Sequence, residues 1–237
     1  SRTGSTNCSP AAEPGPTIRS VGETEITAAP RLVTTLELEE LALIEDELTE
    51  IRRCVPDWVW DGRSLPVPVD QIARELYNLR VCVVSVEAMR EVIGEDPDGH
   101  IGLSGLLLSG QGQIWVSKPE LEYDWGERRH RFTVGHELGH FVMHQDGSPR
   151  VYCRGAEDVE GDATEFDQEA PVPRPVPEAE ANTFAAALLM PFDQVCKRLA
   201  AEPADPVADL REHFGVNRKP ALRRVETVRA LCGSDGY

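Results

Sequence analysis

The sequence lacks the features that would place it in a membrane, on a nucleic acid or outside the cell. No apolar run approaches the roughly 18 residues that a membrane-spanning helix needs. The N-terminus shows no basic segment followed by an apolar one, which a secretory signal would require. The formal net charge of −17 argues against a chain built to hold nucleic acid, because phosphates are neutralised by clustered Lys and Arg. We therefore expect a cytoplasmic protein that contacts no membrane and does not bind nucleic acid directly.

Cysteine is present, but without its usual metal-binding or cross-linking patterns. The six cysteines are widely spread, and none forms a CxxC pair or stands at zinc-finger spacing from a histidine. Disulfide frameworks are typical of shorter chains that are denser in cysteine. We interpret these residues as mainly reduced thiols.

Composition along the chain predicts four regions. Residues 1–33 are rich in Ser, Thr, Pro, Gly and Ala without apolar periodicity, which predicts a disordered arm. Residues 34–63 combine an acidic helix with a proline-punctuated linker. Residues 64–192 alternate between strand and helix patterns, which predicts one folded domain. Residues 193–237 predict a small helical C-terminal subdomain of two or three helices, interrupted by prolines and by Gly215.

The acidic helix expected at 34–53 has two interpretations. Apolar residues recur in it at helical spacing, and Thr34 followed by Glu37 predicts a capping box at its start. Its acidic face could bind a partner, or it could be the solvated side of a helix that packs on its own domain. We favour the packed helix.

The central region predicts an α+β fold in which a small three-stranded sheet packs on two functional helices. The expected strands are 80–86, 101–108 and 113–117, and the expected helices are 70–77, 128–144 and 178–190. The second and third strands form a hairpin. Residues 146–177 are an acidic, proline-rich insertion that could shade a site, although we favour a plain solvated loop.

His136, Glu137 and His140 stand in the pattern HExxH within the helix expected at 128–144. Residues four apart lie on one helix face, so both histidines can present a ring nitrogen to one tetrahedral Zn²⁺. Glu137 lies about 100° around the helix from His136, which suits contact with a water on the metal better than ligation. Zinc makes such a water acidic, and a carboxylate can accept its proton. The pattern predicts a zinc hydrolase with Glu137 as catalytic residue.

The surroundings of HELGH favour a metal site over a chance match. Chance alone would give the pattern in roughly one or two such chains per hundred. The rest of the helix is apolar, where two histidines and a glutamate are unexpected without a metal. Gly135 and Gly139 each lower helix stability by up to about 1 kcal/mol, which indicates that another element packs closely there.

A catalytic zinc usually has three protein ligands and one open position. We expect the third ligand on a later helix, where Glu178 and Glu180 are the candidates. They are two residues apart and face different directions, so only one can bind. Glu178 shares its face with Asn182, which could orient a ligand histidine through its other ring nitrogen. We favour Glu178, with Glu180 as the alternative.

Other residues able to do chemistry lack a clear pattern. His144 continues the four-residue spacing after His140, but by then the helix has turned about 80° from His136. We interpret His144 as an ordinary helix-end histidine, with substrate contact as the alternative. A group that stabilises an oxyanion is expected, and Tyr123 and Tyr152 both remain candidates.

Two segments of the chain resemble the ImmA/IrrE family of metallopeptidases. They are Arg131–His144, with the sequence RFTVGHELGHFVMH, and Glu178–Pro191, with the sequence EAEANTFAAALLMP. The similarity extends over about 64–145 and 178–228. The chain departs from the family pattern in its long acidic insertion, and a second departure is Pro220 near the C-terminus.

The resemblance implies a gluzincin-like α+β fold in which His136, His140 and Glu178 bind Zn²⁺ and Glu137 is the general base. It also implies a protein substrate with a regulatory role, because family members cleave DNA-binding repressors in stress or mobile-element control. The alternative function is a zinc-containing regulatory module that acts by protein contact without proteolysis. A complete set of ligands and base favours the enzyme. The basic stretch Arg211–Arg229 is interpreted as part of a helical cap, with a weak nucleic-acid contact as the alternative.

Overall fold

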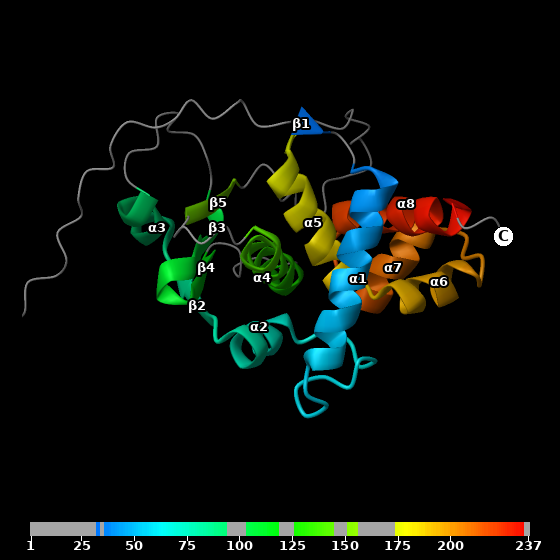
Figure 1. The fold of residues 1–237 in the computed structure, drawn as a ribbon, viewed down its shortest axis with the longest axis horizontal. Helices are drawn as coiled ribbons and strands as arrows, with labels where there is room; N and C mark the ends of the chain where they lie inside the picture. Colours follow the sequence, from blue (N-terminus) through cyan, green and yellow to red (C-terminus); the bar gives the residue numbers. More distant parts are fainter. Residues whose placement is uncertain are drawn as a thin grey trace, which may run out of the picture. The chain divides into compact units, whose positions relative to one another are not determined.

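Helices pack against a small mixed β-sheet, so the predicted α+β class is confirmed (Figure 1). The structure is a computed structural model, and it describes residues 32–33, 36–93, 103–118, 126–144, 151–155 and 174–234. The described residues belong to one compact unit. The arm expected at 1–33 lies outside them except for Leu32 and Val33. None of the described helices is long and apolar enough to cross a membrane.

The main sheet has its described strands in the order β2-β4-β3-β5. They are β2 (Arg80–Val84), β3 (Leu103–Leu108), β4 (Gln113–Ser117) and β5 (Val151–Gly155). β2 runs parallel to β4, and β3 runs antiparallel to both of its neighbours. The turn η1 (Ser109–Gln111) and Gly112, whose φ is +61°, connect β3 to β4. The three predicted strands and the hairpin are therefore confirmed.

β5 is a strand inside the segment 146–177, for which the sequence predicts a solvated loop. The prediction is wrong for residues 151–155, which pair with β3 and place Val151 opposite Leu108. Acidic, proline-rich composition argues against the burial of side chains. A strand added to an open sheet edge is stabilised by backbone hydrogen bonds, which composition does not report. Residues 145–150 and 156–173 lie outside the described part of the chain.

The helix α3 (Val86–Ile93) occupies part of a region where the sequence predicts a strand end and then a loop. Its fully buried Met89 packs with Leu106 and other apolar residues of β3 in a small separate cluster. Val86, Met89 and Ile93 recur at helical spacing, so the signal was present. The helix is short, and the glycines and the proline that follow it in the sequence favoured the prediction of a loop instead.

The helices α4 (Gly126–Met143) and α5 (Val176–Leu189) form the centre of the fold, and both are confirmed to within two residues at each end. α4 lies between the sheet and α5, and α5 in turn packs against two further helices, α1 (Leu38–Cys54) and α8 (Arg218–Ser234) (Figure 1). A Cβ at Gly139 would stand 3.1 Å from the Cα of Ala181, and one at Gly135 would stand 3.4 Å from the Cα of Ala185. Gly139 therefore permits close packing of α4 on α5, as predicted, whereas a Cβ at Gly135 would make only an ordinary van der Waals contact.

The acidic helix is observed as α1 (Leu38–Cys54), and it packs on its own domain as predicted. Its buried residues are Leu41, Ile44, Leu48 and Ile51. The predicted capping box is shifted by one turn. Glu37 is the N-cap, and its backbone N–H donates to Glu40 Oε2 at 2.7 Å. A carboxylate can replace the hydroxyl that the prediction sought at Thr34, which lies outside the described residues.

The helix α2 (Val69–Tyr77) begins at Val69, so Asp70 lies in its first turn and is not the predicted N-cap. It contacts both β2 and α4. A second, two-stranded sheet pairs β1 (Leu32–Val33) antiparallel with β6 (Arg174–Pro175), with Leu32 opposite Pro175. β6 leads directly into α5.

The C-terminal region contains three helices, which agrees with the predicted number. They are α6 (Phe192–Leu199), α7 (Pro206–Phe214) and α8 (Arg218–Ser234). Pro206 is the first residue of α7, and Gly215, whose φ is +62°, ends it. The sequence predicts that prolines interrupt the C-terminal helices, but Pro220 does not interrupt one. It lies in the first turn of α8, where a missing N–H costs nothing.

Arg224 joins α8 to the rest of the fold. Its side chain is 1% exposed, it donates to the carbonyl oxygen of Met190 and it forms an ion pair with Glu45 on α1. Arg224 is therefore a buried structural cation and is not available to a nucleic acid.

Candidate metal centre

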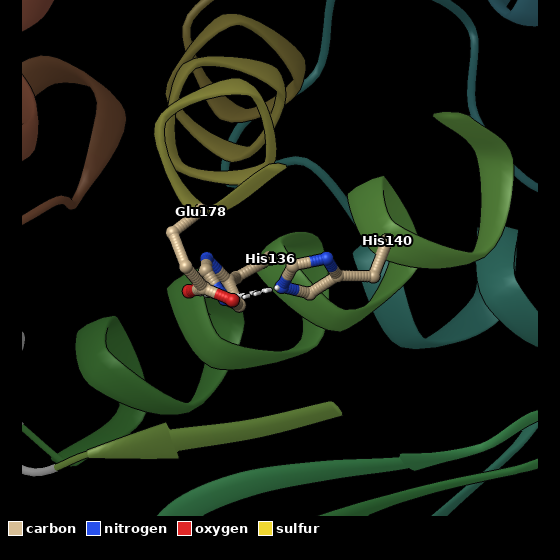
Figure 2. Close-up of side chains that lie close together, drawn as sticks. All are labelled: His136, His140 and Glu178. Carbon is tan, nitrogen blue, oxygen red and sulfur yellow. Dashed lines mark hydrogen bonds and ion pairs between the residues drawn. The ribbon is translucent and has the colours of Figure 1, made fainter. Parts of the chain in front are cut away.

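Two turns of α4 and the first turn of α5 bring His136, His140 and Glu178 together (Figure 2). The Nε2 atoms of the two rings lie 3.0 Å apart. Glu178 Oε2 lies 3.3 Å from His136 Nε2, and Glu178 Oε1 lies 3.1 Å from His140 Nε2. The rings stand nearly perpendicular, with an interplanar angle of 83°, so that their nitrogens converge on one region.

These separations fit a tetrahedral metal ion. Zinc binds imidazole nitrogen and carboxylate oxygen at roughly 2.0–2.1 Å, so neighbouring ligand atoms in a tetrahedron stand about 3.3 Å apart. The two Nε2 atoms are 3.0 Å apart, and each lies 3.1 or 3.3 Å from one of the two carboxylate oxygens of Glu178, which is close to that value. Two imidazoles and one carboxylate are also a common donor set for a catalytic metal. The group could therefore hold a metal ion.

The centre is open to solvent on one side. The side chains of His136 and His140 are each 1% exposed, whereas that of Glu178 is 23% exposed. Burial acts to raise the pKa of Glu178, but hydrogen bonds from the two rings outweigh it, so the net pKa is lowered well below its usual range. Glu178 is thus an ionised carboxylate, as a metal ligand must be.

Glu137 is completely buried and points toward the sheet. A Cβ placed on Gly105 of β3 would lie 2.5 Å from Glu137 Oε1 and 2.6 Å from the methyl carbon of Thr133, one turn earlier on α4. Glycine at position 105 therefore gives the Glu137 carboxylate its space. A single glycine within a strand pattern indicates close approach of another group, so the sequence held a signal for Gly105 that was not used.

Glu180, the alternative third ligand, lies on a different side of the centre from Glu178. Its Oε2 is 2.9 Å from His144 Nε2, and His144 Nδ1 is 3.0 Å from His140 Nδ1. The structure thus brings Glu178, and not Glu180, to the converging Nε2 atoms. Burial lowers the pKa of His144, and the hydrogen bond to Glu180 opposes that effect. Sequence reasoning gave His144 no defined role, whereas the structure places it directly behind His140.

Asn182 supports the ligand helix instead of a ligand ring. Its side-chain nitrogen donates to the backbone oxygen of Glu178 at 2.8 Å. Its Oδ1 is buried and has no hydrogen-bond partner among the described residues. The expected contact of Asn182 with a histidine ring is therefore not observed in this part of the chain.

Two other described histidines make contacts away from the metal centre, and the side chains of the two candidate tyrosines are not among the described ones. His130 Nε2 is 2.8 Å from Asp70 Oδ2, which links α4 to α2, and His213 contacts the neighbouring Phe214 ring edge-on. Tyr123 lies outside the described residues, and the side chain of Tyr152 on β5 is not described. Tyr123 and Tyr152 therefore both remain candidates for the residue that stabilises an oxyanion.

The fold and the site together define a metallopeptidase-type domain, in which an HExxH helix packs against a small sheet and a second helix carries a carboxylate. Residues 123–226 match the model of the peptidase M78 family, described as the IrrE N-terminal-like domain. The match spans both motifs on which the resemblance was based, which confirms it.

One solved structure with a similar chain trace is a Mycobacterium tuberculosis transcriptional regulator. It shares 15% sequence identity, with a TM-score of 0.41, over 80% of this chain and 47% of that chain. The present chain thus spans about half the length of that regulator. No curated protein matches the chain.

Proposed function

We propose that the chain is a zinc-dependent endopeptidase that hydrolyses a peptide bond in a specific protein. A DNA-binding repressor is the candidate substrate, and stress or mobile-element regulation is the candidate setting. We assign the activity to residues 64–192, with 193–237 as a helical subdomain. The observation that carries the proposal is the convergence of two ring nitrogens and the Glu178 carboxylate, at separations close to those of tetrahedral ligands, beside the buried Glu137. The match of residues 123–226 to a peptidase family supports it.

His136, His140 and Glu178 would hold the zinc, which supplies Lewis acidity that activates water and polarises the scissile carbonyl. Glu137 follows His136 directly on α4, and its carboxylate accepts the proton of the attacking water and returns it to the leaving amine. Gly105 of β3 leaves the space that this carboxylate occupies. Since Glu178 is the most exposed of the three ligands, the substrate approaches over the first turn of α5.

The replacement Glu137→Gln tests the proposal. Gln keeps the size of Glu but cannot accept the water's proton, so we expect proteolysis to be lost while one zinc per chain is retained. His136→Ala is the matched variant, in which zinc and proteolysis should both be lost. The readouts are metal analysis of purified protein and co-expression with candidate repressors followed by immunoblotting. Cleavage at the parental rate by Glu137→Gln would overturn the mechanism.

A second candidate function is a zinc-containing regulatory module that acts by protein contact. The observation that favours it is the outer face of α1, where Leu43 is 67% exposed and Leu38 45% exposed among acidic side chains. The same Glu137→Gln variant separates the two functions. Regulation that persists without cleavage in that variant would support the contact function and reject the enzymatic one.

A further inference from the structure

A second hydrogen-bonded group of side chains extends from the metal centre on the side away from Glu178. His140 directs Nε2 toward His136 and Glu178, while its Nδ1 lies 3.0 Å from His144 Nδ1. His144 Nε2 in turn lies 2.9 Å from Glu180 Oε2. The side chain of His144 is 12% exposed and that of Glu180 is 23% exposed, so both are largely shielded from water.

When a metal ion replaces the hydrogen bond from His140 Nε2 to Glu178 and both imidazoles are neutral, the chemistry of the three groups permits one consistent placement of protons. The ionised carboxylate of Glu180 can only accept, so His144 carries its proton on Nε2. The Nδ1 atom of a neutral His144 is then an acceptor, and His140 must donate to it from Nδ1. A neutral imidazole has one N–H, so His140 Nε2 keeps its lone pair for a metal ion. The opposite placement would turn the unprotonated Nε2 of His144 toward a carboxylate, where two acceptors would face each other.

We propose that His144 and Glu180 are positioning residues that fix the tautomer and orientation of His140 for metal binding. The proposal rests on the proposed function only in that the centre binds zinc. Metal-ligating histidines usually donate their other N–H to a partner that raises the basicity of the ring. Here the partner is a histidine backed by a carboxylate. The charge of Glu180 thereby reaches His140 through His144.

The arrangement also gives separate tasks to the two acidic residues near the start of α5. Glu178 contacts the metal-binding face of the two rings, and Glu180 reaches the back of His140 through His144. α5 thus contributes one ligand directly and holds a second ligand indirectly. Glu178 and Glu180 are two residues apart and face different directions, so they cannot both bind the metal. One can therefore be a ligand while the other supports His140 through His144.

Three replacements test the proposal by zinc affinity, without any need for a substrate. His144→Phe removes the acceptor for His140 Nδ1, and we expect the dissociation constant for zinc to rise by about 10- to 100-fold. His144→Asn places an amide oxygen near the position of Nδ1, so it should restore part of that loss. Glu180→Gln keeps an acceptor for His144 without its charge and should weaken binding less than His144→Phe. The measurement is competition for zinc against a chromophoric chelator on metal-stripped full-length chain.

The controls are His213→Asn and Glu212→Gln, which make the same chemical changes on exposed positions of α7. Both should bind zinc like the parent. The absorption spectrum of bound Co²⁺ gives a second readout, which should shift in His144→Phe and Glu180→Gln and stay unchanged in the controls. If His144→Phe fails to fold, Glu180→Gln and His144→Asn still decide the question.

The possible failures are distinguishable. Equal zinc affinities and cobalt spectra in the parent, His144→Asn and Glu180→Gln would overturn the positioning role and leave the proposed peptidase intact. A parent chain that binds no zinc would overturn the proposed function together with this inference. If the parent binds zinc and Glu137→Gln still cleaves the substrate, the peptidase mechanism is rejected but the positioning role is not.

Discussion

Gly105 on β3 lies so close to Glu137 on α4 that a Cβ at position 105 would stand 2.5 Å from the Glu137 Oε1 atom. Because Gly105 has no side chain, β3 leaves space for the carboxylate of Glu137, the candidate catalytic residue. The contact is between the backbone of β3 and the end of the Glu137 side chain, so a side chain at position 105 would have to displace the carboxylate.

The first prediction concerns Gly105→Ala. The added methyl must displace the Glu137 carboxylate, and a displacement of about 1 Å at a reacting group can lower a rate by about 10²-fold. We expect proteolysis to fall by that order while the zinc content of the purified protein stays near one. Overpacking should also destabilise the fold by about 1–3 kcal/mol, measured by urea unfolding. Gly233→Ala is the matched control, because a Cβ there meets nothing within 4 Å.

The second prediction compares Gly139→Ala with Gly135→Ala. At position 139 a Cβ would lie 3.1 Å from Ala181 Cα and from a ring carbon of Phe184, so the replacement should force α4 and α5 apart and cost about 1–3 kcal/mol. At position 135 the nearest atoms lie at 3.4 Å, an ordinary contact. There the gain in helix propensity, up to about 1 kcal/mol, should make the change neutral or stabilising. Opposite signs in chemical denaturation would confirm the packing, and equal losses would contradict it.

The third prediction concerns the buried ion pair between Arg224 and Glu45. Glu45→Gln leaves the Arg224 guanidinium in the interior with only part of its partners, and removal of one member of a buried pair costs about 3–5 kcal/mol. Arg224→Met removes the cation itself and leaves the Glu45 carboxylate, whose side chain is 14% exposed and is thus less deeply buried than that of Arg224, which is 1% exposed. We therefore expect Arg224→Met to lower the free energy of unfolding less than Glu45→Gln does. The reverse order would show that the hydrogen bond from Arg224 to Met190 dominates.

The fourth prediction concerns the pH dependence of the metal-free chain. Hydrogen bonds from His136 and His140 outweigh burial and lower the pKa of Glu178 from 4.5. A carboxyl group whose pKa is lowered in the folded state contributes stability above its unfolded pKa and loses it as the pH falls toward the folded pKa. The parent should therefore be more stable than Glu178→Gln at pH 6, and the difference should shrink steadily below about pH 4.5. A difference that grows on acidification would contradict the assignment.

The sequence predicted the metal-binding side of the centre because its determinants are local. The four-residue spacing of His136 and His140 places both rings on one face of any helix, whatever surrounds it. The apolar surroundings of the motif predicted burial, and the glycines at 135 and 139 predicted the approach of a second helix. Each of these inferences needs only helix geometry and residue size.

The parts that sequence reasoning missed depend on contacts between distant segments. The link from His144 to Glu180 joins the end of one helix to the start of another, and neither residue carries a local sign of the other. β5 was missed because the edge of β3 stabilises it through backbone hydrogen bonds, which its composition does not reveal. The preference for Glu178 over Glu180 agrees with the structure, although what places Glu178 at the ring nitrogens is the rotation of α5 about its axis, which is set by packing against α4.

The pairing of β1 with β6 has a consequence for any work that shortens or extends the chain. Leu32 is hydrogen-bonded into a strand pair with Pro175, and Glu178 follows three residues later on α5. The first described strand thus braces the base of the helix that carries the third donor. An N-terminal truncation that ends before Leu32 keeps this strand pair. One that also removes Leu32 and Val33 leaves the first turn of α5 without the support of β1.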